Sequence, residues 1–164
     1  MSQPPRDPVY LTAAGRRRLE ELAARYAAEV RGWRASEEDE TGGEDRGDAA
    51  ERLIEADDLV PTRDLLAETR AVLARAVPMP EGVDDGIVRL GSTVTIRDEN
   101  GRQSELMVVD PAEFHDGDRQ VAADSPVGQA LLGRARGSQV AIDAPAGRQL
   151  LTIESVEPYR EAAP

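Results

Sequence analysis

The stretch SEEDETGGEDRGDAAE, residues 36–51, separates two long segments with helical periodicity and decides how the first half of the chain folds. Eight carboxylates against one arginine give this stretch a charge of −7, in a chain whose net charge is −12. Its three glycines permit a reversal of chain direction, because glycine adopts backbone angles that other residues avoid. Massed like charges repel and are costly to desolvate. This segment, the acidic tip, is therefore expected either to remain in water or to meet a cationic partner.

Both flanking segments have the apolar spacing of paired helices. A first helix is expected over residues 12–35, with the Thr12 hydroxyl capping its first turn, and a second over residues 48–77. Pro61 removes one hydrogen bond from the second helix, so a kink is expected near residues 57–61. The apolar stripes are Leu19, Leu22, Tyr26, Val30 and Trp33 in the first helix, and Leu59, Leu66 and Leu73, flanked by Leu53, Val60, Leu65 and Val72, in the second.

Two such helices joined by a glycine-rich bend are expected to pair as an antiparallel coiled-coil hairpin, each buried leucine contributing ~1.5–3 kcal/mol. The pattern changes at PMPEGVDDG, a linker with two prolines and two glycines. The predicted organisation is a flexible lead-in at 1–9, the hairpin at 10–77, the linker at 78–86, a second domain at 87–158 and a tail at 159–164.

In the second domain the helical period gives way to strand patterns. Ser125 and Pro126 open a short helix, because serine caps and proline suits the first turn, and Gly133 ends it. Residues 99–102, Glu-Asn-Gly-Arg, are typical of a hairpin turn, and residues 110–124 are acidic and irregular. Strands are expected at 88–90, 93–97, 105–109, 139–143 and 149–156. The fold class is therefore expected to be α+β, with a small antiparallel sheet and one short helix packed on a face.

The composition excludes several classes of protein. Cysteine is absent, which excludes disulfides and thiolate metal sites and suits a reducing cytoplasm. No apolar run approaches the roughly 18–20 residues that span a bilayer, and the opening MSQPPRDPVY lacks the features of a secretion signal. A sequence pI of about 4.6 argues against direct, non-specific binding to nucleic acid, which requires neutralised phosphates. We expect a cytoplasmic monomer without a membrane partner.

Three stretches match motifs of one known family. SPVGQALLGRARGSQVAIDAPAGRQLLTIESVE, residues 125–157, is similar to its C-terminal signature, and VRLGSTVTIRD, residues 88–98, to the opening of its sheet. GDAAE, residues 47–51, matches the GD-x-x-E part of its GDLSENAEY motif. Over about residues 10–157 the chain resembles the Gre family (GreA/GreB-like) of bacterial transcript-cleavage elongation factors and their non-cleaving relatives. The resemblance implies a coiled-coil hairpin followed by an FKBP-like domain.

The resemblance also implies a partner and a way of acting on it. The second domain would dock at the rim of the secondary channel of RNA polymerase core enzyme, and the hairpin would carry the acidic tip towards the active centre. Nucleic acid, DNA included, would be met only through the elongation complex. The docking surface would be formed by Ser125, Pro126, Gln129 and Leu131. From the residues alone, this segment is explained equally well as a helix cap with packing residues.

Carboxylates suit the divalent metal of a phosphoryl-transfer centre, because hard cations prefer oxygen ligands. By position, the resemblance assigns to Asp48 and Glu51 the retention of a second Mg²⁺ and the orientation of the water that cleaves backtracked RNA. No cofactor is expected on the chain alone, because this Mg²⁺ would be shared with the polymerase. An Asp-x-x-Glu pair at a helix start is also a capping box, and the other acids can form a solvated loop. Further tip contacts would come from Asp39, Glu40, Glu44 and Asp45.

The tip departs from the family motif in ways that bear on cleavage. Ala50 stands where the motif has serine, Arg52 where it has asparagine, and Leu53-Ile54-Glu55 where it has Ala-Glu-Tyr. Attack by water needs fixed geometry, and the loss of polar neighbours loosens it. The sequence therefore favours a modulatory or inhibitory accessory factor over one that stimulates cleavage of backtracked RNA. Neither is an enzyme by itself.

Two other functions find less support in the residues. An FKBP-like fold suggests a peptidyl-prolyl isomerase, but a fold does not carry activity, and only Phe114 and Tyr159 could line a ring-rich pocket. A chaperone-like grip needs an exposed apolar patch, whereas the acidic tip is polar. His115, the only histidine, has no cysteine or second histidine beside it for a metal site.

Overall fold

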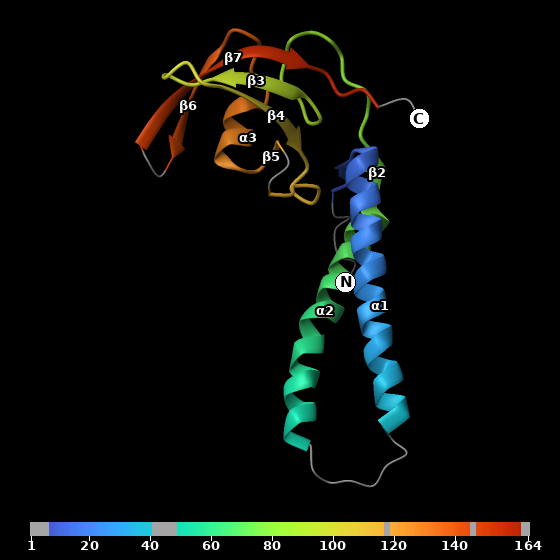
Figure 1. Ribbon diagram of the computed structural model, residues 1–164. Helices are drawn as coiled ribbons and strands as arrows, with labels where there is room; N and C mark the ends of the chain where they lie inside the picture. Colours follow the sequence, from blue (N-terminus) through green and yellow to red (C-terminus); the bar gives the residue numbers. More distant parts are fainter. Residues whose placement is uncertain (1–6, 41–48, 117–118, 145–146, 162–164) are drawn as a thin grey trace, which may run out of the picture. The chain divides into compact units, whose positions relative to one another are not determined.

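The computed structural model describes residues 7–40, 49–116, 119–144 and 147–161, with the backbone alone at 34–40, 49–60 and 143–144. The chain divides into two compact units (Figure 1): a helical unit, Arg16–Arg75, and a sheet unit, Met1–Gly15 with Ala76–Pro164. No helix in the described part of the chain combines the length and the apolar character needed to cross a membrane.

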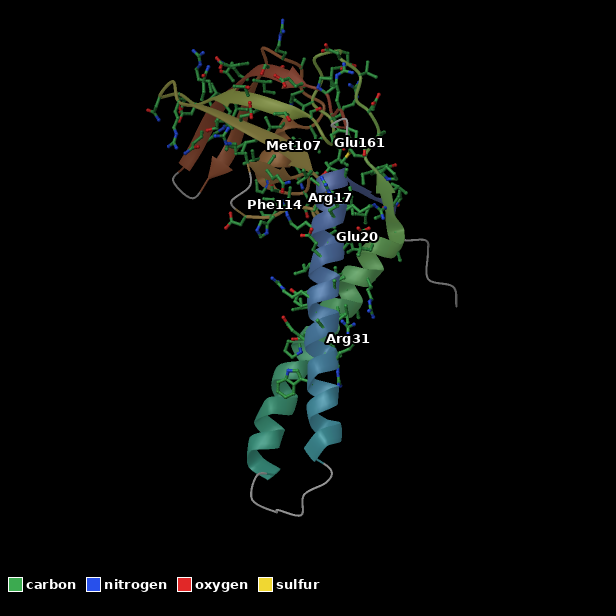
Figure 2. All side chains as sticks on the ribbon, turned by 45° about the vertical axis from the view of Figure 1, so that its right-hand side comes forward. Arg17, Glu20, Arg31, Met107, Phe114 and Glu161 are labelled. Atoms are coloured by element: carbon green, nitrogen blue, oxygen red, sulfur yellow. The ribbon has the colours of Figure 1, made fainter. Side chains whose placement is uncertain are left out.

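The helical unit is built from two long helices, α1 (Ala13–Glu40, 28 residues) and α2 (Ala49–Arg75, 27 residues). They lie side by side and run in opposite directions (Figures 1 and 2). Val30 and Leu66, one from each expected apolar stripe, are buried, and this burial stabilises the pairing. Leu65, predicted to flank the leucine repeat, is instead 43% exposed. Helix α2 continues through Pro61 without a break.

Two short strands form a parallel pair: one precedes α1 in the sequence, and the other follows α2. Strand β1 (Val9–Leu11) pairs with β2 (Ala76–Pro78), and the ladder continues where the Met79 N–H donates to the Leu11 carbonyl at 2.8 Å. Tyr10 is exposed between two buried residues, the alternation of a strand. The sequence had placed Val9 in a flexible lead-in and residues 76–77 in the second helix. Both predictions were wrong, because a three-residue strand is too short to show a period.

Five strands form the main sheet, in the order β5-β4-β3-β7-β6. Their bounds are β3 Thr93–Arg97, β4 Gln103–Val109, β5 Gln120–Ala122, β6 Gln139–Ala144 and β7 Gly147–Glu157. Strands β4 and β5 are parallel, so the prediction of an antiparallel sheet was wrong at β5, which lies in the irregular segment 110–124. Strand β3 has its predicted bounds. Residues 88–90, predicted as a strand, form none, although Val88 is buried in the core.

The core of the sheet unit lies between the sheet and the short helix α3 (Pro126–Leu131), which covers one face of the sheet (Figure 1). Val94 and Ile96 of β3 point into it, and Thr95 between them does not, because successive side chains of a strand alternate between faces. Leu131 meets them from α3 and is fully buried. The expected combination of long helices with a sheet is confirmed.

Candidate functional site

In the acidic tip, the structure describes the backbone of residues 36–40 and 49–51. Asp39 and Glu40 are the last two residues of α1, and Glu51 is the third residue of α2. The other predicted tip residues, Glu44, Asp45 and Asp48, lie outside the described residues. Among the residues that are described, no group of three or more potential metal-ligating side chains occurs. The metal contacts of these carboxylates stay a prediction.

The end of α1 carries charge that does not stabilise the helix. Its last four residues, 37–40, are all acidic, and the last turn holds no basic residue. The carbonyl end of a helix has partial negative charge, so each acid there costs about 0.3–1 kcal/mol. Glu51, by contrast, takes the third helical position, where the glutamate of a capping box stabilises a helix start. Capping can therefore explain Glu51 but not residues 37–40.

The predicted docking segment is held in shape by its own hydrogen bonds. Ser125 caps α3: its Oγ accepts from the Gly128 N–H at 3.0 Å and donates to the Ala122 carbonyl at 2.7 Å. The Gln129 side-chain amide donates to the Asp124 carbonyl at 2.9 Å. Leu131 is buried in the core, so it supports this surface from beneath and cannot present its side chain to a partner. Of the four predicted docking residues, Pro126 and Gln129 are exposed and Ser125 is half-buried.

Gly128 lets α3 approach the preceding chain closely. A Cβ at this position would overlap the Ala122 carbonyl oxygen and would lie 2.9 Å from the Ala123 Cα. Both obstacles are backbone atoms, which cannot swing aside as a side chain can. A glycine inside a very short helix often marks such a close approach. The sequence prediction of this helix did not include that role for Gly128.

A buried carboxylate at the start of α1 was also missed. The Glu113 side chain, 4% exposed, accepts hydrogen bonds from the Thr12 N–H at 2.8 Å and from the Thr12 hydroxyl. The Thr12 Oγ1 in turn accepts from the Gly15 N–H at 2.9 Å, which confirms the predicted cap. A Cβ on Gly15 would overlap the Glu113 carboxyl. Glu113 therefore joins the connection between β4 and β5 to the first turn of α1.

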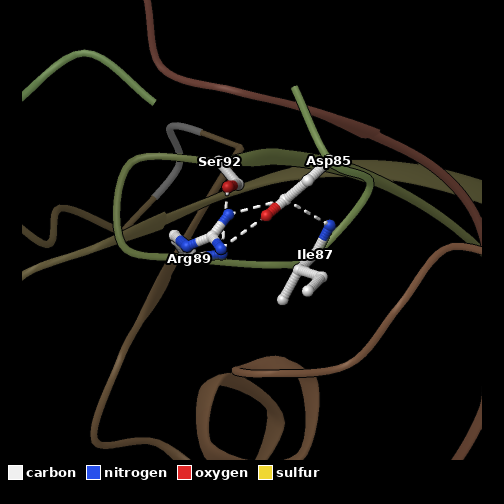
Figure 3. Close-up of polar contacts among 4 residues, drawn as sticks. All are labelled: Asp85, Ile87, Arg89 and Ser92. Atoms are coloured by element: carbon white, nitrogen blue, oxygen red, sulfur yellow. Dashed lines mark hydrogen bonds and ion pairs between the residues drawn. The ribbon is translucent and has the colours of Figure 1, made fainter. Parts of the chain in front are cut away.

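An exposed ion pair closes the loop before β3 (Figure 3). The two terminal nitrogens of Arg89 each donate to a different carboxylate oxygen of Asp85 at 2.6 Å, and the Ile87 N–H donates to Asp85 at 3.1 Å. The Arg89 N–H donates to the Ser92 Oγ at 3.0 Å. Hydrogen bonds from Arg89 and from the Ile87 backbone lower the pKa of Asp85 from 3.8 to about 2. The hydrogen bonds to the Asp85 carboxylate in turn raise the pKa of Arg89.

The Asp85–Arg89 pair predicts a pH dependence with a definite sign. Because the pKa of Asp85 is lower in the folded protein, its stabilising contribution is present above about pH 3.8 and is lost as the pH falls through about 2. A ¹³C NMR titration of the Asp85 carboxyl should show a midpoint near 2, and Arg89→Gln should move that midpoint up towards 3.8. Arg119→Gln, a control that removes an arginine paired with Glu105 and not with Asp85, should leave it unchanged. An Asp85 midpoint near 3.8 in the unaltered protein would contradict the structure.

The two aromatic residues considered for an isomerase pocket, Phe114 and Tyr159, lie in different environments. Phe114, on the connection between β4 and β5, is 44% exposed (Figure 2), whereas Tyr159 is buried at 8%. The two rings therefore do not form a shared, ring-lined pocket. The exposed His115 offers its backbone N–H to the Gln120 side-chain oxygen at 3.2 Å.

Comparison with known proteins gives matches over most of the chain. Residues 83–158 match the family model "Transcription elongation factor, GreA/GreB, C-term". The chain is 32% identical over 163 residues to transcription elongation factor GreA of Chloroflexus aurantiacus, covering 91% of this chain and 97% of that protein. It is 34% identical over 88 residues to the transcription inhibitor protein Gfh1 of Thermus thermophilus, covering 52% of this chain and 56% of that protein.

Among solved structures, the chain is similar to the crystal structure of GreA factor homolog 1 (Gfh1) of Thermus thermophilus. The identity is 25% and the TM-score 0.41, with 92% of this chain and 99% of that chain covered. The sequence matches define the class of the protein, a transcription elongation factor. Within that class, the chain belongs to the GreA/GreB family, as its motifs had indicated.

Proposed function

We propose that this protein binds bacterial RNA polymerase at the secondary channel and regulates elongation there, with its acidic tip close to the Mg²⁺ of the active centre. It acts in the cytoplasm as an accessory factor without an active site of its own. The observation that carries the proposal is the position of the acidic tip, a charge of −7 between two antiparallel helices in a member of an elongation-factor family. The acids that end α1 at a cost to the helix support an external target of positive charge.

The sheet unit serves in this proposal as an FKBP-like docking domain. The surface offered to the polymerase is the start of α3, where Pro126 and Gln129 are exposed. Ser125 and Leu131 hold that surface in shape, through the cap and through core packing respectively. Because this segment is fixed by its own contacts, little ordering of the chain would be needed on binding.

The proposed effect on the polymerase is inhibitory or modulatory. Three departures from the family motif support it, at residues 50, 52 and 53–55, which replace the polar neighbours of Asp48 and Glu51. A tip with many carboxylates but without the positioning residues can occupy a metal centre without orienting water for cleavage. Stimulation of cleavage, as in standard factors of the family, is the alternative outcome of the same binding.

Purified elongation complexes, stalled in a backtracked state, test this proposal with and without the full-length protein. We expect slower nucleotide addition without shortening of the RNA 3′ end.

Asp48→Asn combined with Glu51→Gln should leave polymerase binding within about twofold and relieve the inhibition. Pro126→Glu should weaken binding by at least about tenfold, because it puts charge into a desolvated contact while an acid at this position still suits the helix start.

Gln139→Glu, which adds the same charge at an exposed position of β6, is the matched control and should bind like the unaltered protein. Shortened RNA 3′ ends would overturn the inhibitory effect but keep the polymerase as partner. Failure of the unaltered protein to bind polymerase would end the proposal.

A further inference from the structure

A cavity of about 290 Å³ lies between α1 and α2, within the helical unit. Its apolar floor is formed by Val30 and Leu66, which are buried, beside the half-buried Ala27 and the exposed Ala67. Its remaining lining residues are three arginines, Arg31, Arg63 and Arg70, which are all exposed, and no carboxylate lines it. We call this site the arginine cavity; its volume is close to the lower end of the ~300–1,000 Å³ of small-molecule sites.

The chain carries 32 acids and 20 basic residues. Within the residues that the structure describes, none of the three guanidinium groups nevertheless forms an ion pair with an acid. Some arginines elsewhere do: pairs include Arg16–Glu20, Arg89–Asp85, Arg97–Glu154 and Arg119–Glu105. Three positive charges without an ion pair therefore line the same partly apolar cavity.

The sequence around each arginine explains the missing partners. On a helix, a side chain meets the residues three and four positions away. For Arg31, Arg63 and Arg70, none of these positions holds an acid. They hold alanine, leucine, valine and one further arginine, at residues 27, 28, 34, 35, 59, 60, 66, 67, 73 and 74. The helices thus place three uncompensated charges beside apolar surface, which favours a ligand with several negative charges and an apolar part.

We propose that the arginine cavity binds a nucleoside polyphosphate, with the phosphates on Arg31, Arg63 and Arg70 and the planar base over Ala27 and Ala67. Guanidinium groups bind phosphate oxygens through paired, charge-assisted hydrogen bonds, and three of them match a di- or triphosphate. The apolar floor provides contact for an aromatic base, which inorganic phosphate lacks. This binding is separate from the proposed action on polymerase and does not depend on it.

Isothermal titration calorimetry of the full chain at constant ionic strength tests the proposal, with ATP, adenosine, inorganic tripolyphosphate and a short RNA with a 5′ hydroxyl as probes. We expect ATP to bind at least tenfold more tightly than any other probe. Arg63→Gln and Arg70→Gln should each weaken ATP binding about tenfold, because a charge-assisted hydrogen bond is lost. Ala67→Leu, which fills the cavity and keeps every charge, should weaken ATP binding but not tripolyphosphate binding.

Arg17→Gln removes an exposed charge from α1 outside the cavity and should leave ATP binding unchanged (Figure 2). Circular dichroism would verify that each variant keeps its helices, and Arg31→Gln replaces any variant that does not. Absence of ATP binding, or an equal loss with Arg17→Gln, would overturn the proposal. Equal affinities for tripolyphosphate and ATP would overturn the nucleoside part, and tighter binding of RNA would show a nucleic-acid surface instead.

Discussion

Gly128→Ala should destabilise the sheet unit by about 3 kcal/mol or more, at the upper end of what overpacking costs. The added Cβ would meet backbone atoms at residues 122 and 123, so relief would require α3 to move away from the chain before it. That movement would break the bond between the Ser125 Oγ and the Ala122 carbonyl and would uncover the buried Leu131. Urea unfolding, followed by circular dichroism and by NMR of the sheet unit, would measure the change.

Gly32→Ala is the matched control for this substitution. Gly32 lies in the middle of α1, and a Cβ there would find nothing within 4 Å. Alanine favours a helix over glycine by about 1 kcal/mol, so this variant should be slightly more stable than the unaltered protein. If Gly128→Ala had as little effect as Gly32→Ala, the close approach of α3 would be wrong.

Glu113→Ala is the second substitution with a large expected effect, a loss of about 2–4 kcal/mol. It would leave the Thr12 N–H and hydroxyl buried without their acceptor, and a buried donor that loses its partner costs about 1–3 kcal/mol. Glu113→Gln keeps one acceptor oxygen and should lose less. Chemical unfolding would give the overall change, and faster hydrogen exchange at the Thr12 and Gly15 amides would locate it.

Glu99→Ala provides the comparison, because Glu99 is an exposed acid in the turn between β3 and β4. Surface substitutions of this kind stay within about 0.5 kcal/mol. Glu113→Ala and Glu99→Ala with the same stability would mean that the buried carboxylate does not hold the start of α1.

Local patterns predicted the elements that local forces determine. The apolar spacing around Val30 and Leu66 predicted both long helices, and Thr12 and Ser125 cap their helices as expected. Alternation predicted the bounds of β3. Helix caps and amphipathic faces depend on residues within a turn or two of each other, so a sequence displays them directly.

Elements that depend on distant partners were missed. Strand β1 exists because Val9–Leu11 pairs with Ala76–Pro78, and β5 because Gln120–Ala122 pairs with the end of β4. Each is three residues long and has no measurable period of its own. The burial of Glu113 was missed for the same reason, since its partner Thr12 is far away in the sequence.

For the predicted docking segment, the structure gives the exposure of the side chains, and docking itself stays a prediction. Pro126 and Gln129, both predicted to contact a partner, are exposed. Leu131 was expected on that face and is buried, because the six-residue helix turns it towards the sheet. The three arginines of the arginine cavity were not recognised, because they come from two helices and line one cavity only when those helices pair.

Strands β1 and β2 have a mechanical consequence. The chain enters α1 directly from β1 and leaves α2 directly into β2, and these strands are hydrogen-bonded to each other. A force on the far end of either helix is therefore carried by both strands and not by one. Before the helices could separate where they join β1 and β2, the hydrogen bonds between these strands would have to break. The two helices should therefore resist such a force together and not independently.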